Sequence, residues 1–417
     1  MTVSGPEVLA RTRSERSRTR RWAGLIAILS VASAIGQFST SVYIPCFPAM
    51  IEALGTTEAA MQLTLTAYLI PLAVFQLVFG PLSDRFGRKP TLLAGMAVFF
   101  AGSVVCAASS DVLAVVVGRA LQGLGACAGL VVSRAMARDL FDGPVLLRVM
   151  SLMAMAFALV PGLSPLVGGA IQDGFGWRAT FGASAVLGLL IWLLIALRIP
   201  ETLHEPSADL TLRRWAAGFG PMVRSRRFQA NSVSTLFMLG GLMSFLAGSP
   251  GFMIGDLGLK PSEYGLYPPI AITGFLVGAT TANRVAERFD SGRLIFCGLA
   301  IGLLGGVAPL LLLAAGALDE ITLTAAMWVF LGSMGVVLPA ATATAIAPFF
   351  DRAGAASAVI GFEQMLGGAA GTVVVSALAP ALDAYAFTVG MAAFGVLAMS
   401  TFILMTRNAD PASSSQR

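Results

Sequence analysis

The sequence predicts an all-α integral membrane protein in which twelve transmembrane helices form two pseudo-symmetric bundles of six. The first observation is composition: 56% of the residues are hydrophobic and only 12% are charged. That charged share is roughly half of the 25% that is usual in soluble proteins. The second is that apolar runs of about 20 residues, the length that crosses a bilayer, recur along the chain. The third is a polar linker at residues 199–229, which divides these runs six and six.

The apolar runs set the boundaries of the predicted spans and domains. The first run follows a basic stretch and contains Ala32-Ser33-Ala34, as a secretory signal would, but it continues to Pro45 and is too long for a removed signal. We therefore predict a retained first span, a basic tail at 1–21, bundles at 22–198 and 230–406, and a second tail at 407–417. The predicted spans are 22–47, 60–82, 91–110, 112–137, 146–171, 179–198, 230–254, 264–286, 294–317, 321–346, 355–379 and 383–406.

The distribution of charge gives an independent test of these spans. With the N-terminus in the cytoplasm, 24 of the 27 Lys and Arg residues fall in cytoplasmic tails, loops or helix ends. The exceptions are Arg119, Arg178 and Lys260. A bias of Lys and Arg toward cytoplasmic loops sets the orientation of membrane proteins, so we predict that both termini are cytoplasmic.

An internal repeat supports the division into halves. Asp84-Arg85-Phe86 after the second span recurs as Glu287-Arg288-Phe289 after the eighth. The equivalent position of the two copies indicates duplication of a six-span unit. Secondary transporters built this way have halves related by an axis along the membrane normal.

The same sequence argues against enzymatic and metal chemistry. Its four cysteines lie singly in apolar runs, its one histidine, His204, lies in the linker, and no Gly-rich nucleotide loop followed by Lys-Ser/Thr occurs. We expect no enzyme activity, no cofactor and no metal. The net charge of +5 reports membrane topology, so no nucleic-acid partner is expected.

Two charged residues lie well inside the predicted spans, Arg119 in the fourth and Glu363 in the eleventh. An ionised group in hydrocarbon costs at least about 2.5–3.5 kcal/mol, so each should face a cavity or a partner. Arg119 also fits a structural ion pair or a snorkelling guanidinium. Glu363 lies near mid-membrane, where burial favours a neutral carboxyl; it is a candidate proton carrier or a protonated, hydrogen-bonded acid without a role.

The segment GPLSDRFGRKP, residues 80–90, predicts a tight polar turn between the second and third spans. Glycine adopts positive φ freely and proline does not continue a helix, so together they favour a sharp reversal. This segment resembles the signature loop of the major facilitator superfamily. The resemblance implies a cytoplasmic gating role for Gly80, Asp84, Arg85, Gly87 and Arg88. Simple positive-inside anchoring is the alternative.

Two further motifs resemble the same superfamily. Arg119-Ala-Leu-Gln-Gly-Leu-Gly125 is similar to its fourth-span motif, whose arginine is implicated in proton coupling. The fifth span, PGLSPLVGG at residues 161–169, is similar to the motif of its antiporters, although Ser164 replaces the first glycine. Proline interrupts the backbone ladder and glycine permits close helix approach, so we expect conformational roles for Pro161, Pro165, Gly168 and Gly169.

The first span ends in SVYIPCFP, residues 41–48, and the second begins with Gln62-Leu-Thr-Leu65. These stretches resemble the bicyclomycin and chloramphenicol resistance (Bcr/CflA) branch, whose members are twelve-span, proton-driven drug exporters of the inner membrane. That branch usually has an aspartate where this chain has Ser41, so the usual proton-carrying acid is missing and Glu363 is the candidate replacement. The polar residues that we expect to line a substrate cavity, each of which also fits an interhelical hydrogen bond, are Gln37, Ser41, Tyr43, Tyr68, Gln122 and Gln364.

These features together predict an antiporter that exports small amphipathic drugs by alternating access, with Arg119 acting on the Glu363 carboxyl by proximity. Its expected partners are a small-molecule substrate, protons and the lipid bilayer of a bacterial inner membrane, and we expect a monomer. Two alternatives remain: an exporter of a sugar, amino acid or siderophore with the same fold, and a non-transporting membrane sensor.

Overall fold

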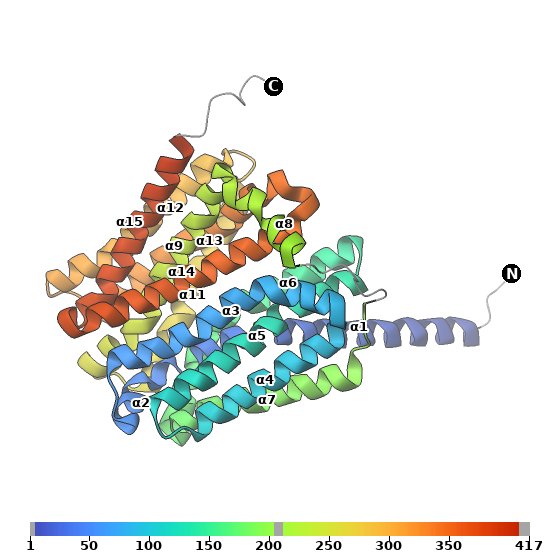
Figure 1. Ribbon diagram of the computed structural model, residues 1–417, viewed down its shortest axis with the longest axis horizontal. Coiled ribbons are helices and arrows are strands. Elements are labelled where there is room, and N and C mark those ends of the chain that lie inside the picture. Colours follow the sequence, from blue (N-terminus) through green and yellow to red (C-terminus); the bar gives the residue numbers. More distant parts are fainter. Residues whose placement is uncertain (1–4, 204–211, 408–417) are drawn as a thin grey trace.

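The computed structural model describes residues 5–203 and 212–407; the predicted tails and linker therefore fall partly outside the described residues, as does His204. The described chain is a succession of helices (Figure 1). Their bounds are α1 (Gly5–Ser41), η1 (Ile44–Cys46), α2 (Phe47–Leu54), α3 (Glu58–Phe86), α4 (Arg88–Ala108), α5 (Val112–Leu140), α6 (Gly143–Phe175), α7 (Trp177–Arg198), α8 (Leu212–Arg224), α9 (Arg226–Pro250), η2 (Gly251–Asp256), α10 (Pro261–Tyr264), α11 (Tyr267–Val285), α12 (Ser291–Ala314), α13 (Glu320–Ile346), η3 (Ala347–Arg352), α14 (Ala353–Leu382) and α15 (Tyr385–Arg407).

These helices correspond to the predicted spans. Ten segments among the described residues are long and apolar enough to cross a membrane. One of them, Glu320–Leu382, contains α13 and α14 in succession, and α11 is less apolar because it carries Pro268, Pro269 and Arg284. The all-helical membrane fold predicted from the sequence is confirmed.

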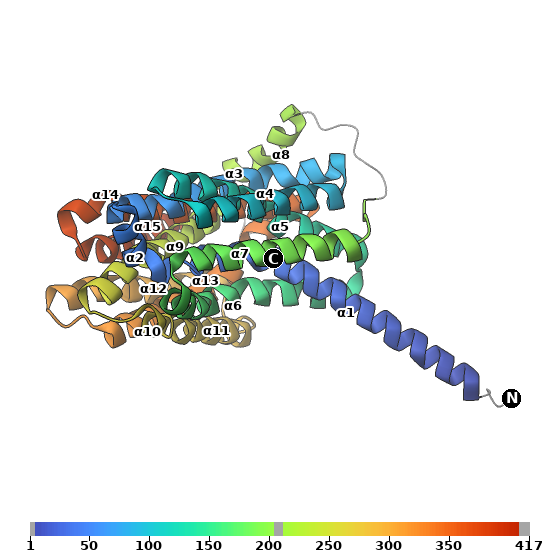
Figure 2. The same ribbon diagram turned by 90° about the horizontal axis from the view of Figure 1, so that it is seen from below.

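Local sequence explains where several helices begin. Thr57, Asp111 and Asp319 accept hydrogen bonds from the backbone N–H three residues later, at 3.2, 2.8 and 2.7 Å. Such N-caps satisfy donors that the first helical turn leaves unpaired. At the other extreme, α1 has no break between the basic stretch and the first span, so that its first turns extend beyond the other helices (Figure 2). Ala, Arg and Glu are good helix formers, which accounts for this continuation.

The reversal between α3 and α4 lies within the predicted segment, residues 80–90, but not at the glycine–proline pair that begins it. Gly80 and Pro81 do not make the turn; both lie inside α3, which continues to Phe86. The chain turns at Gly87, whose φ of +98° is unfavourable for other residues. Membrane helices tolerate an internal proline where neighbouring groups satisfy the freed carbonyl, so Pro81 is a weaker stop signal here than in a soluble helix.

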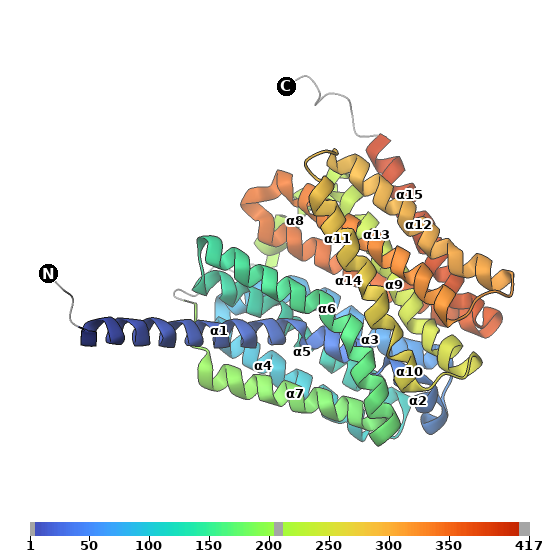
Figure 3. The same ribbon diagram turned by 180° about the vertical axis from the view of Figure 1, so that it is seen from behind.

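The helices form two bundles. In the first, α5 packs against α1, α3 and α4, and in the second α9 packs against α14 and α15, while α13 packs against α11 and α12. The bundles meet along two seams, α3 with α14 and α6 with α11 (Figures 1 and 3). These seams join the second span to the eleventh and the fifth span to the eighth. A two-fold axis between the halves pairs the second span with the eighth and the fifth with the eleventh, so it converts one seam into the other.

We call the two ends of the helix bundle the Gly55 end and the Gly87 end, after the turns found there. Four hydrogen bonds join the bundles toward the Gly55 end. They link Thr66 to Thr372 (2.6 Å), Ser376 to the Ala59 carbonyl (2.9 Å), the Ser262 amide to Asp173 (3.3 Å) and the Gln62 amide to the Ala247 carbonyl (3.5 Å). The structure is therefore held together across its two halves on the Gly55 side.

Candidate functional site

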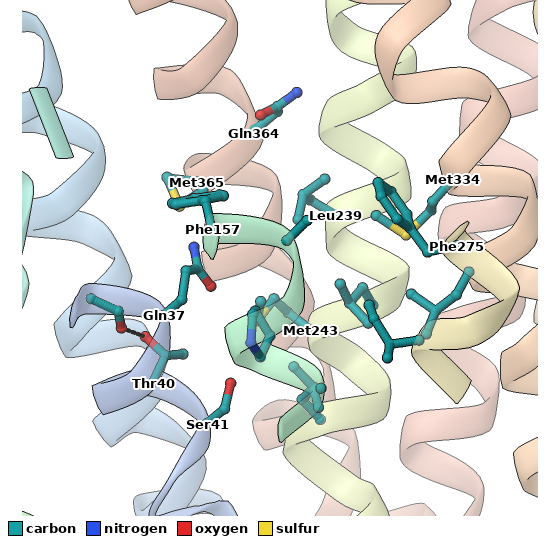
Figure 4. A pocket seen from close by; sticks show the side chains of 18 of the residues that line it. Gln37, Thr40, Ser41, Phe157, Leu239, Met243, Phe275, Met334, Gln364 and Met365 are labelled. Carbon is teal, nitrogen blue, oxygen red and sulfur yellow. Dashed lines mark hydrogen bonds between the residues drawn. The ribbon is translucent and has the colours of Figure 1, made fainter. Parts of the chain in front are cut away.

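A cavity of about 210 Å³ lies between the two bundles (Figure 4). Four of the six residues that we expected to line a substrate cavity are present in its wall: Gln37, Ser41, Tyr68 and Gln364. The wall is formed by Ser33, Gly36, Gln37, Thr40, Ser41, Tyr68, Leu69, Leu72, Ala126, Leu130, Phe157, Ala158, Pro161, Gly162, Leu239, Leu242, Met243, Phe245, Leu246, Pro268, Ala271, Ile272, Phe275, Met327, Leu331, Met334, Leu338, Gln364 and Met365.

The cavity has one polar face and one apolar face. The polar face comes mainly from α1, where Ser33, Gln37, Thr40 and Ser41 recur at helical spacing and so share one side of the helix. The apolar face comes from helices of the second bundle, and the same spacing explains why its residues point inward together. Its members on α9 and α13 are Leu239, Leu242, Met243, Phe245, Leu246, Met327, Leu331, Met334 and Leu338.

Arg119 lies behind the polar face in a fully buried cluster. Its guanidinium carbon is 4.3 Å from the ring centres of both Tyr43 and Tyr68, so the cation is sandwiched between two aromatic rings. Its Nη1 donates to the Ser39 carbonyl and hydroxyl, both at 3.1 Å, and to the Gln122 Oε1 at 2.8 Å. Within the described chain its Nε and Nη2 have no hydrogen-bond partner. Cation–π contacts and hydrogen bonds thus replace a counter-ion.

Two expected cavity residues belong to this cluster instead. Tyr43 lies against Arg119 and its hydroxyl contacts Thr64 at 3.0 Å, while the Gln122 amide donates to Ser103 at 2.7 Å. Neither lines the cavity: Tyr43 packs its ring against Arg119, and Gln122 accepts a hydrogen bond from Arg119 one turn away on α5. Tyr68 connects the two regions: its ring touches both Arg119 and the cavity, and its hydroxyl donates to the Gly36 carbonyl at 2.9 Å.

Glu363 occupies a second polar cluster between α14 and α9, where the residue is only 9% exposed. Its carboxyl accepts hydrogen bonds from the Ser232 hydroxyl and from the Gln229 amide, the latter at 3.2 Å. The Thr235 hydroxyl donates to the Ser232 carbonyl at 2.8 Å and accepts from Gln364 at 3.3 Å. Hydrogen bonds therefore connect the surroundings of Glu363 to a side chain in the cavity wall.

The sequence prediction did not include the α9 residues around Glu363. Gln229, Ser232 and Thr235 recur every three residues, so they lie on one face of α9. That spacing was available as a signal in the sequence. Their partner was not, because only the structure shows that this face packs against α14.

The two intramembrane charges lie in separate surroundings. Arg119 contacts residues of the first bundle, whereas Glu363 contacts residues of the second. Among the described residues no contact joins them. The expectation that Arg119 acts on the Glu363 carboxyl by proximity therefore has no direct contact to support it and stays a prediction.

The turn at Gly87 carries a third polar cluster. Arg88 pairs with Asp84 at 2.5 Å and with Asp139 at 3.0 Å, and its amide donates to Glu201 at 3.0 Å. A β-carbon at position 87 would lie 2.7 Å from the Glu201 carboxylate. The cluster ties the α3–α4 turn to the end of α5 and to the segment after α7. Arg85 lies over the Phe86 ring at 5.3 Å.

The helix α6 packs closely against its own bundle and against the second bundle. It is one continuous helix that contains Pro161 and Pro165. A β-carbon on Gly168 would overlap the Val42 carbonyl of the first bundle, and one on Gly169 would overlap the Pro261 carbonyl of the second. Small residues allow such backbone contact between membrane helices. Gly168 therefore permits close packing within the first bundle, and Gly169 permits close packing between the two bundles.

Comparison with known proteins supports the resemblances seen in the motifs. The sequence profile of the Major Facilitator Superfamily matches residues 29–372. The chain belongs to this superfamily. It is 30% identical over 352 residues to multidrug resistance protein D of Escherichia coli (strain K12), covering 84% of this chain and 88% of that protein. It is 31% identical over 366 residues to the chloramphenicol resistance protein of Pseudomonas aeruginosa, covering 85% and 84%.

Two further similarities are to a Bacillus protein and to a solved structure. The chain is 30% identical over 346 residues to the uncharacterized MFS-type transporter YdgK of Bacillus subtilis (strain 168), covering 82% of this chain and 86% of that protein. Among solved structures, it resembles a bacterial homolog of the human lysosomal transporter Spinster, crystallised in an inward-facing and unoccupied conformation, with a TM-score of 0.74. That alignment has 15% identity and covers 93% of this chain and 97% of the other, so it shows the shared transporter fold.

Proposed function

We propose that this member of the superfamily is a proton-coupled exporter of small amphipathic molecules in a bacterial inner membrane. The observation that carries the proposal is the connection of a buried acid to a cavity: Glu363 accepts a hydrogen bond from Ser232, which Thr235 links to Gln364 in the wall. Protonation or deprotonation of a carboxyl group beside the cavity would change its hydrogen bonds at the same time. The relatives named for multidrug and chloramphenicol resistance support the export of drugs.

The orientation follows from the basic residues. The Gly87 end carries Arg88, Lys89, Arg138 and Arg198, and positive residues accumulate on the cytoplasmic side of bacterial membrane proteins. We therefore assign the Gly87 end, with both termini, to the cytoplasm. The hydrogen bonds that join the bundles toward the Gly55 end then close the outer side, which supports an inward-facing state.

The proposed cycle uses the residues in distinct roles. Glu363 takes up a proton in the outward-open state and releases it to the cytoplasm as substrate enters the cavity. Arg119 holds α1, α3 and α5 together through Ser39, Tyr68 and Gln122, so its contacts change when the bundle reshapes the cavity. Gly169 of α6 acts on closure of the outer end, and the Gly87 cluster acts on closure of the inner end. A single chain contains the cavity, and we propose that the monomer is the working unit.

The apolar face of the cavity favours this substrate class over the alternative metabolites. Sugars and amino acids need many hydrogen bonds when they leave water, whereas Leu and Met side chains on α9 and α13 offer none. A membrane sensor would bind a ligand without moving it. Neither alternative is favoured by a specific feature of the cavity.

The test uses purified protein in proteoliposomes with a pH-sensitive dye inside. We expect an imposed pH gradient to drive uptake of chloramphenicol, and chloramphenicol to drive proton movement when no gradient is imposed. Dissipation of the gradient by an uncoupler should stop uptake. Binding of chloramphenicol without any flux would contradict the proposal and favour the sensor.

A further inference from the structure

The side chains that line the cavity carry no formal charge. Among the described residues its wall contains no Asp, Glu, Lys, Arg or His. A cation that enters such a cavity loses its hydration shell and meets no counter-charge, and the free-energy cost of that loss is large. The wall thus disfavours charged ligands whatever their shape.

The nearest charge behind the polar face adds to this discrimination. The Arg119 guanidinium carbon lies 4.3 Å from the centre of the Tyr68 ring, and Tyr68 also lines the cavity. A cationic ligand in contact with Tyr68 would therefore lie close to a fixed positive charge. Glu363, the nearby acid, is not part of the wall, and its carboxyl is held by Gln229 and Ser232.

The polar face still offers hydrogen bonds to a ligand. The hydroxyls of Ser33, Thr40 and Tyr68 already donate to backbone carbonyls of α1. By contrast, the side chains of Gln37 and Ser41 make no hydrogen bond to other described residues, and Figure 4 shows both on the α1 side of the cavity. An amide and a hydroxyl are thus available to donate to or accept from an uncharged polar group.

The opposite face suits the apolar part of such a ligand. Met243, Met327, Met334 and Met365 supply flexible, polarizable side chains that adapt to different shapes. We propose that the cavity selects uncharged amphipathic molecules, binds their polar group at Gln37 and Ser41, and excludes lipophilic cations. This deepens the proposed function by naming its substrate class, and it makes Ser41 the residue that sets charge selectivity.

The experiment measures equilibrium binding to the purified full-length protein in detergent, with radiolabelled chloramphenicol as the uncharged probe and tetraphenylphosphonium as the cation. We expect the wild-type protein to bind chloramphenicol at least tenfold more tightly than it binds tetraphenylphosphonium. Ser41→Asp should raise the affinity for tetraphenylphosphonium at least tenfold. Ser41→Asn, which is similar in size to Asp but uncharged, should give the cation no such gain.

A second variant and a second measurement keep the outcome decisive. If Ser41→Asp does not fold, Gln37→Glu places a carboxylate on the same face and should give the same gain. Equal affinity of the wild-type protein for both probes, or binding of neither, overturns the inference. If equal affinity disappears in Glu363→Gln, that acid supplies the missing counter-charge. Equilibrium binding is measured without a gradient and does not depend on proton-driven flux. The relative affinity for the two probes can therefore be interpreted even if the proposed export fails.

Discussion

Gly169 of α6 lies against the backbone of Pro261 in the other bundle, with no room for a β-carbon between them. Separation of the two bundles at the Gly55 end would break this contact, because Pro261 belongs to the second half of the molecule. Gly169→Ala should therefore disfavour closure and shift the population about tenfold toward the state open at that end. Overpacking of this kind costs about 1–3 kcal/mol, which covers such a shift. Spin-label distances across the Gly55 end would measure it.

Two neighbouring glycines serve as controls for this variant. Gly168 faces Val42 within its own bundle, so Gly168→Ala should lower the melting temperature without a matching change in the spin-label distances. A β-carbon on Gly174 would meet no other atom within 4 Å, so this position should tolerate alanine in both assays. An unchanged distance distribution in Gly169→Ala would show that α6 does not limit closure.

Arg119 provides a test that separates stability from transport. Its Nε and Nη2 are buried without partners in the described chain, so the cluster bears the cost of an incompletely satisfied cation. Desolvation of a buried ion costs several kcal/mol, and an apolar side chain of similar size avoids that cost. Arg119→Met should thus change the melting temperature by only a few degrees, by about 1 kcal/mol or less of unfolding free energy, while abolishing proton-driven transport.

Arg119→Lys is the matched variant, because it keeps the charge and loses the flat guanidinium between Tyr43 and Tyr68. It should impair transport as well if the stacked geometry is needed. A large loss of stability in Arg119→Met, with normal specific transport by the protein that remains folded, would instead assign Arg119 a purely structural role.

The spans were predictable because their length and apolarity are local properties of the sequence. The positions of α3, α5 and α14 follow from those runs within a few residues. The reversal lies within the predicted segment, residues 80–90, but at Gly87 and not at Gly80-Pro81, for a related reason. A local pattern identifies Pro81 as a breaker, but whether a helix tolerates it depends on neighbours that the pattern does not include.

Side-chain direction limited the prediction of the cavity. Gln37 and Gln122 are both polar residues in spans, yet only Gln37 lines the cavity, because packing of α1 and α5 decides which face turns inward. The apolar face of the cavity could not be predicted for another reason. In the sequence, Met243 and Met334 cannot be distinguished from residues that face lipid. Long-range contacts, such as that of Ser232 with Glu363, are not encoded in any local spacing.

The ion pairs at the Gly87 end predict a partial redundancy. Arg88 contacts both Asp84 and Asp139, so loss of one acid leaves the other in place. Asp84→Asn should slow the exchange between conformations by a few fold with substrate affinity nearly unchanged. The double variant Asp84→Asn/Asp139→Asn should slow it by more than the product of the single effects, since neighbouring residues in one network are non-additive. Single-molecule fluorescence would measure these rates. Rates equal to that of the wild-type protein in all variants would show that the cluster has no gating role and only anchors the cytoplasmic end.

Glu363→Gln is the variant that decides what drives transport. Glutamine keeps the size of the side chain and hydrogen-bonding capacity toward Gln229 and Ser232, but it cannot carry a proton in exchange for substrate. We expect uptake driven by a pH gradient to fall at least a hundredfold while chloramphenicol binding and exchange across the membrane without a gradient persist. Gln229→Leu is the comparison, because it removes one hydrogen bond and leaves the acid; it should alter the pH dependence of uptake without eliminating coupling. Gradient-driven uptake at the wild-type rate in Glu363→Gln would place the proton site elsewhere in the chain.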